Sequence, residues 1–329
     1  MASRTEQLEL PKCHLSDMFS STVSDTKDIK DTKKTTRKKR KLIDKKVCSN
    51  NEQKVPEKNT VRVDYQKLVS CIATGGQLGD EHINAANLLL RSQFPDLQGL
   101  CTPVLGQRLS FPEFNAVQGY AGFYYFQVLH TGSNHWVTVQ IFSQEEARVY
   151  DSVFLKPTFH TLKQIASIVK SMCSQMQIIL ERVQCQKNAV DCGIYAIAFL
   201  TDLCHGLDPA SNKYHSSKEL RKHLIQCFEQ GIMSPFPSTT SSKAKPLIKD
   251  LSVYCSCRLP FVLEHMKKDE VPADEDTQMI QCDLCNCWYH CSCVKVTSSQ
   301  LKEFSKPNVI WTCEFKGCSA FYDDIFDSD

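Results

Sequence analysis

Three residues in the middle of the chain, His135, Asp151 and Cys192, could together form an activated thiol. A cysteine is a strong nucleophile only as thiolate, so its sulfur needs an imidazolium or the N-terminus of a helix close by. Cys192 begins the apolar segment CGIYAIAFLTDLC, where a helix is expected to start. His135 would act as the general base, and Asp151 would hold the imidazole in the productive tautomer. The chemistry that this set predicts is that of a cysteine peptidase.

The segments around these residues predict how they would be brought together. Three segments rich in β-branched and aromatic residues predict strands, at 123–129, 135–142 and 147–151. His135 begins one of these strands and Asp151 ends the next, so antiparallel pairing would place both at one end of a sheet. Gln186, six residues before Cys192, could direct its amide N–H at the developing oxyanion.

The remaining elements of this region are expected to alternate between helix and strand. An apolar helical face follows Asp80, which could cap the helix. A second helix is expected over 158–173, a strand over 176–183, and a third helix from Cys192. The sequence therefore predicts an α+β domain.

The stretches HWVTVQIFSQEEARVYDS and QKNAVDCGIYAIAF are similar to the SUMO and ubiquitin-like-protein protease family in their His-Trp, Asp-Ser and Gln-x5-Cys-Gly elements. This resemblance implies a papain-like fold, in which a central mixed sheet is flanked by helices and no cofactor serves catalysis. It also implies the roles given above for His135, Asp151, Gln186 and Cys192. Trp136 would correspond to the wall over the Gly-Gly tail of the substrate. The chain departs from the family pattern at one place, because Gln77 stands where the family usually has a second tryptophan.

Two alternatives remain beside the active peptidase. His135, Asp151 and Cys192 could be unrelated core or surface residues, or the domain could keep the fold and lack turnover. The other cysteines of this region are interpreted as buried or incidental thiols, because none precedes a glycine at a helix start: Cys71, Cys101, Cys173, Cys185, Cys204 and Cys227.

Nine of the 18 cysteines fall between Cys255 and Cys318, which is the density of a metal-binding segment. Eight of the residues there form four pairs: Cys255 and Cys257, Cys282 and Cys285, His290 and Cys293, Cys313 and Cys318. Eight nitrogen and sulfur ligands would fill two tetrahedral zinc ions and leave no open position, so both ions would be structural.

The segments YCSCRLPF, MIQCDLCNCWYHCSC and WTC together resemble the plant homeodomain (PHD) finger. That resemblance implies a cross-brace. One zinc would be held by Cys255, Cys257, His290 and Cys293, and the other by Cys282, Cys285, Cys313 and Cys318. The four-residue spacing of the last pair and the long loop 262–278 depart from the commonest pattern, and Cys287 and Cys291 offer alternative ligands. A RING-type ubiquitin ligase finger is the second interpretation, and the position of Trp311 argues against it.

Four side chains of the finger fall where PHD fingers that bind methylated lysine place the walls of an aromatic cage: Tyr254, Phe261, Met279 and Trp288. Ring faces hold a trimethylammonium group by cation–π attraction. The alternative is that these side chains are the core of a small, zinc-stapled domain.

The ends of the chain differ from its middle. Residues 1–62 are poor in aromatic side chains and rich in Lys, Thr, Ser and Asp, which predicts a disordered region. Basic residues cluster between Lys33 and Lys46, which is typical of a nuclear import signal or of non-specific contacts with phosphates. No apolar run is long enough for a membrane span and no secretory signal is evident, so we expect an intracellular protein, nuclear by its basic cluster and otherwise cytoplasmic.

These observations predict four regions: a disordered N-terminal region (1–62), a ubiquitin-like protease domain (63–232), a linker (233–250) and a PHD-type finger (251–329). The predicted function is hydrolysis after the Gly-Gly end of a ubiquitin-like modifier, SUMO-like above all, with the finger docking on chromatin or a histone tail. The alternative is an inactive protein that binds a modifier and reads chromatin. A peptidase next to such a finger also resembles proteins derived from mobile elements.

Overall fold

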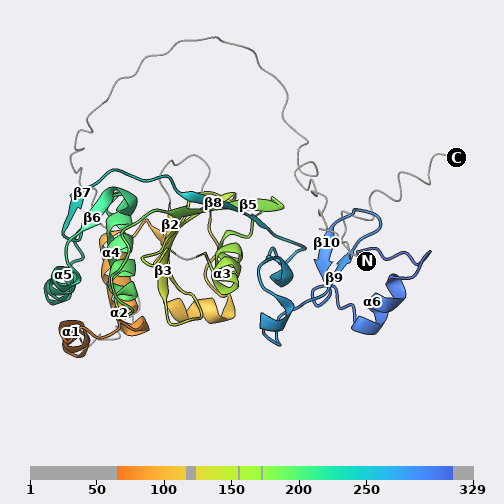
Figure 1. Cartoon of the computed structure of the whole chain (residues 1–329), viewed down its shortest axis with the longest axis horizontal. Coiled ribbons are helices and arrows are strands. Elements are labelled where there is room, and N and C mark those ends of the chain that lie inside the picture. The colour runs from red at the N-terminus through yellow and green to blue at the C-terminus, as the bar shows by residue number, and fades with distance from the viewer. Residues whose placement is uncertain (1–64, 116–123, 155, 172, 314–329) are drawn as a thin grey trace, which may run out of the picture. The chain divides into compact units, whose positions relative to one another are not determined.

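A computed structural model describes residues 65–115, 124–154, 156–171 and 173–313 (Figure 1). The predicted N-terminal region, with its basic cluster, lies outside these residues, as does Cys318. Within the described ranges, none of the helices has the length and apolar character needed to cross a membrane.

The centre of the described chain is a six-stranded mixed sheet with the strand order β1-β2-β3-β4-β5-β8 (Figure 1). The strands are β1 (Gln98–Gly99), β2 (Tyr125–His130), β3 (Trp136–Ile141), β4 (Glu146–Tyr150), β5 (Gln175–Glu181) and β8 (Leu247–Ser252). Pairing is antiparallel from β2 to β4 and between β5 and β8, and parallel between β1 and β2 and between β4 and β5. The predicted α+β fold with a central mixed sheet is confirmed.

Helices follow and precede these strands along the chain. They are α1 (Tyr65–Ala73), α2 (Asp80–Gln93), α3 (Phe159–Val169), α4 (Cys192–Cys204) and α5 (Ser217–Gln230). A 3-10 helix, η2, covers Pro103–Arg108, another, η3, covers Pro209–Ser211, and β6 (Asn212–Tyr214) pairs with β7 (Ser238–Thr240). Every residue of α4 is buried, which explains why its sequence is apolar on all sides.

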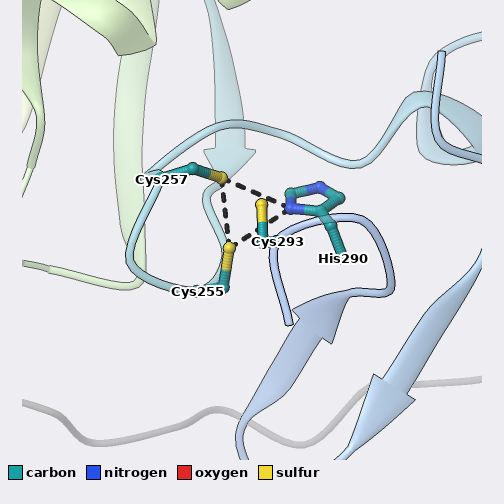
Figure 2. Close-up of side chains that lie close together, drawn as sticks. All are labelled: Cys255, Cys257, His290 and Cys293. Atoms are coloured by element: carbon teal, nitrogen blue, oxygen red, sulfur yellow. Dashed lines mark hydrogen bonds between the residues drawn. The ribbon is translucent and has the colours of Figure 1, made fainter. Parts of the chain in front are cut away.

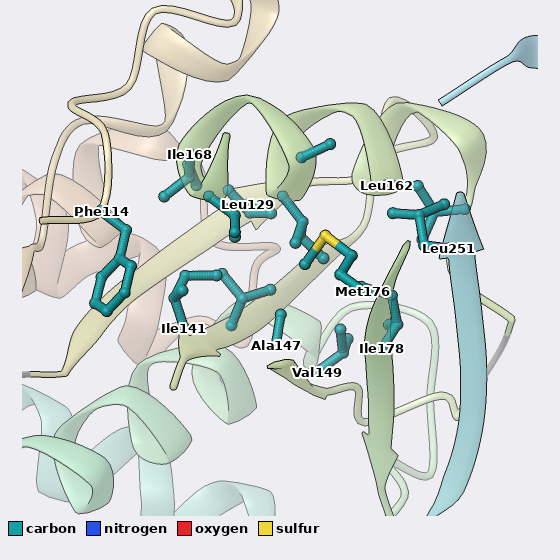
Figure 3. Packing of buried hydrophobic residues seen from close by; sticks show 14 of the residues in the cluster. Phe114, Leu129, Ile141, Ala147, Val149, Leu162, Ile168, Met176, Ile178 and Leu251 are labelled. Atoms are coloured by element: carbon teal, nitrogen blue, oxygen red, sulfur yellow. The ribbon is translucent and has the colours of Figure 1, made fainter. Parts of the chain in front are cut away.

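The alternation of side chains along β3 separates the two faces of the sheet. Val137, Val139 and Ile141 join a core that includes Leu162 and Ile165 of α3 (Figure 3). The other face meets α4, where the hydroxyl of Thr138 donates to the carbonyl of Ala196 at 2.8 Å. The helix that begins with Cys192 is therefore packed directly on the strand that follows His135.

Two strands fall inside the segment 233–250, for which the sequence predicts a linker. β7 lies there, and β8 begins at Leu247 and pairs with β5 over its whole length. Leu251 of β8 is fully buried in the core shared with α3. The prediction of a linker is therefore wrong for this part of the segment, because its apolar residues complete the sheet.

The zinc-finger segment contains a two-stranded antiparallel sheet of β9 (Met279–Gln281) and β10 (Trp288–His290), followed by α6 (Ser298–Phe304). Two 3-10 helices precede it, η4 (Val262–Glu264) and η5 (Lys268–Glu270). Ile280 and Tyr289 form a small core on one face of this hairpin, with Trp311 packed against it. So small a core requires another source of stability, and metal ligation is the usual one.

Candidate active site and metal centre

His135 and Asp151 lie at the same end of two neighbouring strands. His135 immediately precedes β3 and Asp151 immediately follows β4, and the two strands pair in antiparallel fashion. The imidazole Nε2 lies 2.7 Å from the carboxylate Oδ1 of Asp151. That oxygen also accepts the backbone N–H of Val153 at 2.8 Å, which fixes the carboxylate in place. The carboxylate can therefore orient the imidazole and stabilise its charged form.

Cys192 is the first residue of α4 and is buried, and its thiol interacts with the His135 imidazole. Because Nε2 of His135 faces Asp151, Nδ1 is the ring nitrogen that is left to hydrogen-bond with the Cys192 sulfur. Burial acts to lower the pKa of His135, but hydrogen bonds to Asp151 and Cys192 and their charges outweigh it and raise the pKa to about 9. The imidazole is therefore protonated at neutral pH.

The pKa of Cys192 is shifted in the opposite direction. Burial is the largest single effect and acts to raise it, but the hydrogen bond and charge of His135 and the backbone N–H groups of Trp136 and Gly193 together outweigh burial. The pKa of the thiol is therefore below its ordinary value. A lowered cysteine pKa beside a raised histidine pKa is the electrostatic signature of a thiolate–imidazolium pair.

Gly193 allows the chain to pass close to the start of α4. A Cβ atom at this position would lie 2.7 Å from the Cβ of Leu78, which is far too short for a contact. The carbonyl of Leu78 accepts the indole N–H of Trp136 at 2.9 Å. The segment around Leu78 is thus held against both α4, which begins with Cys192, and Trp136, which follows His135.

Gln77 lies next to the residue before His135. Its amide nitrogen donates to the carbonyl of Asn134 at 3.0 Å, and its amide oxygen accepts from the Asn134 side chain at 3.1 Å. Gln77, Asn134 and Trp136 line one cavity of about 400 Å³. The two residues expected to contact substrate, Gln77 and Trp136, are therefore brought together, with an amide pair where the family usually has an aromatic wall.

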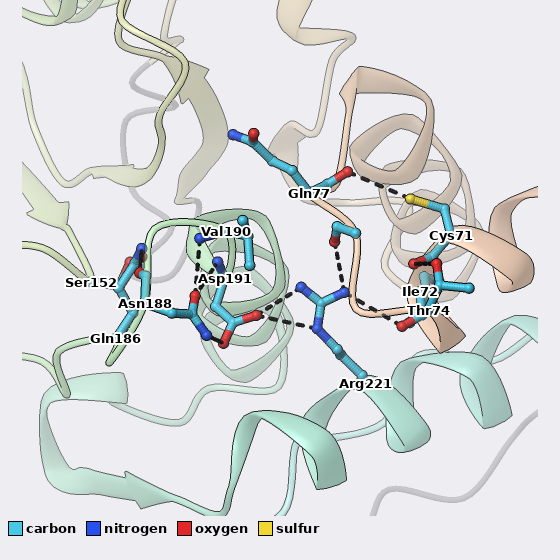
Figure 4. Close-up of polar contacts among 11 residues, drawn as sticks. Cys71, Ile72, Thr74, Gln77, Ser152, Gln186, Asn188, Val190, Asp191 and Arg221 are labelled. Atoms are coloured by element: carbon cyan, nitrogen blue, oxygen red, sulfur yellow. Dashed lines mark hydrogen bonds and ion pairs between the residues drawn. The ribbon is translucent and has the colours of Figure 1, made fainter.

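Gln186 lines a second cavity of about 530 Å³, together with His135 and Asp151. Its amide nitrogen donates to the carbonyl of Asn188 at 2.6 Å, and its amide oxygen accepts from the hydroxyl of Ser152 at 2.6 Å (Figure 4). One of its two amide hydrogens is thus committed to its own loop. The side chain lies beside the site, and its second N–H is the group that could serve an oxyanion.

The first predicted zinc ligand set is assembled in one place. The ligand atoms of Cys255, Cys257, His290 and Cys293 all lie within 4.8 Å of one another (Figure 2). The two sulfurs of Cys255 and Cys257 are 3.1 Å apart, and Nδ1 of His290 lies 3.3 and 3.4 Å from them. Tetrahedral zinc with bonds of about 2.0 to 2.3 Å separates its ligands by about 3.3 to 3.8 Å. The two distances to His290 fall in this range and the two sulfurs lie slightly closer together, so the donor set fits the ion after a small outward movement of one thiol.

The second predicted set is assembled as far as the structure describes it. Cys282, Cys285 and Cys313 lie with their sulfurs within 4.8 Å of one another, and the fourth predicted ligand, Cys318, lies outside the described residues. Residues far apart in the sequence alternate between the two groups, which is the cross-brace arrangement. Cys287 and Cys291 belong to neither group.

Three of the four cage candidates lie around His290, one of the four candidate ligands of the first zinc. The rings of Tyr254 and Phe261 have their centroids 6.3 and 6.2 Å from the imidazole, and Met279 pairs with His290 across the β9–β10 hairpin. Trp288 lies two residues before His290, on the same face of the hairpin. All four side chains are half-buried rather than fully enclosed in the core.

Residues 124–232 match the family model of the Ulp1 protease family, C-terminal catalytic domain. The chain thus contains a cysteine peptidase domain of the Ulp1 family. The matched range includes His135, Asp151, Gln186 and Cys192 and excludes Gln77. Residues 267–315 match the family model of the PHD finger, which identifies the cysteine-rich segment after the peptidase domain as a zinc-binding PHD finger.

Three solved structures illustrate the likeness of this Ulp1-type domain to known proteases. The C-terminal Ulp1 protease domain in complex with Smt3, the yeast ortholog of SUMO, is 16% identical, covers 50% of this chain and 81% of its own, and has a TM-score of 0.40. The SUMO protease Ulp1 with its catalytic cysteine oxidised to a sulfenic acid is 17% identical, with coverages of 54% and 97% and a TM-score of 0.40. A de-sumoylating protease is 12% identical, with coverages of 50% and 84% and a TM-score of 0.36. These likenesses are too distant to add weight to the family match, and no curated protein matches the chain.

Proposed function

We propose that the chain is a thiol peptidase that hydrolyses the bond after the C-terminal Gly-Gly of a ubiquitin-like modifier, with a SUMO-like modifier as the first candidate. The observation that carries this proposal is the contact of His135 with both Asp151 and Cys192, inside a segment that matches the Ulp1 protease family. Within that family match, the geometry supplies a nucleophile, a base and an orienting carboxylate.

The reaction follows from these positions. The Cys192 thiolate attacks the carbonyl carbon of the last glycine, and the charge that develops on the carbonyl oxygen is stabilised by N–H groups at the start of α4. The His135 imidazolium gives its proton to the leaving amine, and a thioester remains on Cys192. A water molecule, deprotonated by His135, then hydrolyses the thioester and restores the thiol.

A suicide probe tests this proposal. The probe is a ubiquitin-like modifier whose C-terminal glycine carries an electrophile, used as a panel that includes SUMO and ubiquitin. We expect a covalent adduct with the wild type and none with Cys192→Ser, while Cys185→Ser, which changes an exposed thiol, should react like the wild type. If no modifier gives an adduct but one binds reversibly, the inactive modifier-binding protein is the correct alternative.

For the finger, we propose two structural zinc ions and a docking role on chromatin. The first ligand set is complete and the second has three sulfurs in place, so Cys318 would complete it. The half-buried positions of Tyr254, Phe261, Met279 and Trp288 support binding of a methylated lysine of a histone tail. Nuclear import through residues 33–46 would bring the protein to this target, and a reporter protein carrying this segment tests it by its location in cells.

A further inference from the structure

Arg221 forms a buried ion pair with Asp191, the residue before Cys192. It belongs to α5, is 6% exposed, and has its Nη2 2.7 Å and its Nε 3.2 Å from Oδ1 of Asp191 (Figure 4). Asp191 is 2% exposed and immediately precedes Cys192. The third nitrogen, Nη1, donates to the carbonyl of Gly76 at 2.8 Å. The guanidinium thus ties the residue before the nucleophile to the loop between α1 and α2.

The second oxygen of the Asp191 carboxylate is also engaged. Oδ2 accepts from Nδ2 of Asn188 at 2.6 Å, while Oδ1 of Asn188 accepts the backbone N–H groups of Val190 and Asp191 at 2.9 and 3.0 Å (Figure 4). Burial acts to raise the pKa of Asp191, but hydrogen bonds from Ser217, Arg221 and Asn188 outweigh it and hold the pKa below its ordinary value. The carboxylate is therefore ionised and held on the side of α5.

It is unusual for the carboxylate of an aspartate at the N-cap of a helix to point away from that helix, as the carboxylate of Asp191 does. Asp191 is the N-cap residue of α4, and an N-cap aspartate commonly accepts the N–H of the second or third helical residue. In this helix Asp191 makes no such bond, so its carboxylate does not occupy the N–H groups of Gly193 and Ile194. The N–H of Gly193 instead serves the sulfur of Cys192.

We propose that Arg221 is a positioning residue that holds the Asp191 carboxylate away from the N-terminus of α4 and so reserves the first N–H groups of that helix for Cys192 and the oxyanion. The inference rests on the proposed role of Cys192 as the nucleophile. A buried carboxylate that loses its cation turns to the nearest donors, and the free N–H groups of α4 are adjacent. The carboxylate would then occupy those donors and add a negative charge beside the thiolate.

The test compares Arg221→Met, which removes the cation at similar volume, with Arg221→Lys, which keeps it. The readout is the pH dependence of Cys192 alkylation by iodoacetamide, followed by mass spectrometry on the peptide that contains Cys192. In Arg221→Met we expect the apparent pKa of the thiol to rise by about one unit, seen as a shift of the whole alkylation profile to higher pH. Arg221→Lys should stay close to the wild type, since a charged partner remains.

A second change separates positioning from simple destabilisation. Adding Asp191→Asn to Arg221→Met removes the misdirected charge, so the double variant should regain most of the lost alkylation rate although two buried groups are changed. A merely structural role predicts a double variant no more reactive than Arg221→Met. If Arg221→Met does not fold, Asn188→Ala, which frees one carboxylate oxygen, should raise the thiol pKa in the same direction by a smaller amount. An unchanged thiol pKa in the folded variants, or no gain from Asp191→Asn, overturns the proposal.

Alkylation by a small reagent needs no modifier, so this result is independent of the suicide-probe experiment. A protein that no modifier probe labels, but whose thiol pKa responds to Arg221, refutes the proposed substrate and leaves the positioning role standing. A protein that a modifier probe labels, but whose thiol pKa is the same in Arg221→Met as in the wild type, supports the proposed substrate and refutes the positioning role. With the labelled enzyme, Arg221→Met should lower kcat and leave KM nearly unchanged, because α4 donors act on the transition state.

Discussion

The side chain of Gln77 makes two hydrogen bonds to Asn134, 57 residues away in the sequence: it donates to the backbone carbonyl at 3.0 Å and accepts from the side-chain amide at 3.1 Å. Asn134 has a left-handed backbone conformation, with φ of 56°, and immediately precedes His135. The pairing of Gln77 with Asn134 therefore fixes the loop that leads into His135. An amide at position 77 both donates and accepts in this pair, whereas a tryptophan has one donor and no acceptor and could make only one of the two bonds.

Breaking this pair should weaken the site and the fold together. Removal of an amide pair of this kind typically costs about 1 kcal/mol of the free energy of unfolding, because water replaces the lost bonds in part. We expect Gln77→Ala, which removes both bonds, to lower stability by this amount. Asn134→Gly, which suits the left-handed backbone and removes only the side-chain bond, should lower stability by less and add little in the double variant, measured by urea denaturation. Gln107→Ala, which changes another residue of the same cavity, is the matched control. Fully additive losses would show that the two side chains do not act as a pair.

The pH dependence of activity should reflect the ion pair of Cys192 and His135. The reactive form carries a thiolate and an imidazolium, so kcat/KM should rise with pH as Cys192 ionises, below its ordinary pKa of 9.0, and fall as His135 loses its proton at about 9. The pKa of His135 is raised from 6.5, so its contribution to stability is complete below pH 6.5 and is lost as the pH rises through about 9.

Cys192→Ser provides a direct check of this coupling. It removes the thiolate that helps to raise the His135 pKa, so NMR titration should show a lower pKa for this imidazole, while Cys185→Ser should leave it at about 9. A His135 pKa that is the same in both variants would mean that the two groups do not interact.

The sequence is most informative where residue type and local pattern agree. Strands expected at 123–129, 135–142 and 147–151 are found at 125–130, 136–141 and 146–150, because their aromatic and β-branched residues pack in a buried sheet. The helix starting at Cys192 is found as expected, while that over 158–173 ends at Val169, where Lys170 turns left-handed. Short-range signals thus place the histidine, the carboxylate and the cysteine.

The contacts that the sequence did not reveal depend on long-range packing. Arg221 lies 30 residues after Asp191, and no local pattern distinguishes it from the other basic residues of α5. Strand β8 follows a segment rich in Pro, Ser and Lys, and this composition predicts a linker. The segment forms a strand because its backbone pairs with β5, whose edge would otherwise have no hydrogen-bonding partner in the sheet.

Strand β8 should therefore be needed for the stability of the peptidase domain. Leu251 of β8 is fully buried in the core that also contains residues of α3. Truncation of such a leucine typically lowers the free energy of unfolding by about 2 to 5 kcal/mol. We expect this loss for Leu251→Ala in thermal or urea denaturation of the full chain. Ile248→Ala changes a side chain of the same strand that is 54% exposed and should cost less than about 0.5 kcal/mol. Equal effects of the two substitutions would contradict the packing of β8 in the sheet.

Zinc content should depend on the residues that the structure groups together. Cys293→Ser removes a ligand of the complete set, so we expect about one zinc ion fewer per chain by metal analysis than in the wild type. Cys287→Ser alters a neighbouring cysteine that belongs to neither group and should keep the full content. Loss of zinc in both variants, or in neither, would show that the ligands are differently assigned.

The finger should prefer a trimethylated over an unmethylated lysine peptide of a histone tail. A trimethylammonium group has no N–H to donate and depends on ring faces, each worth about 0.5 to 2 kcal/mol, so loss of one ring should weaken binding about tenfold. Trp288→Ala tests this in isothermal titration calorimetry. Gln281→Ala, the residue that pairs with Trp288 across the β9–β10 hairpin, is the control, and both variants should retain zinc. Equal affinity of the wild type for methylated and unmethylated peptides would leave Trp288 and its neighbours as packing around His290, and the finger would then dock on another kind of surface.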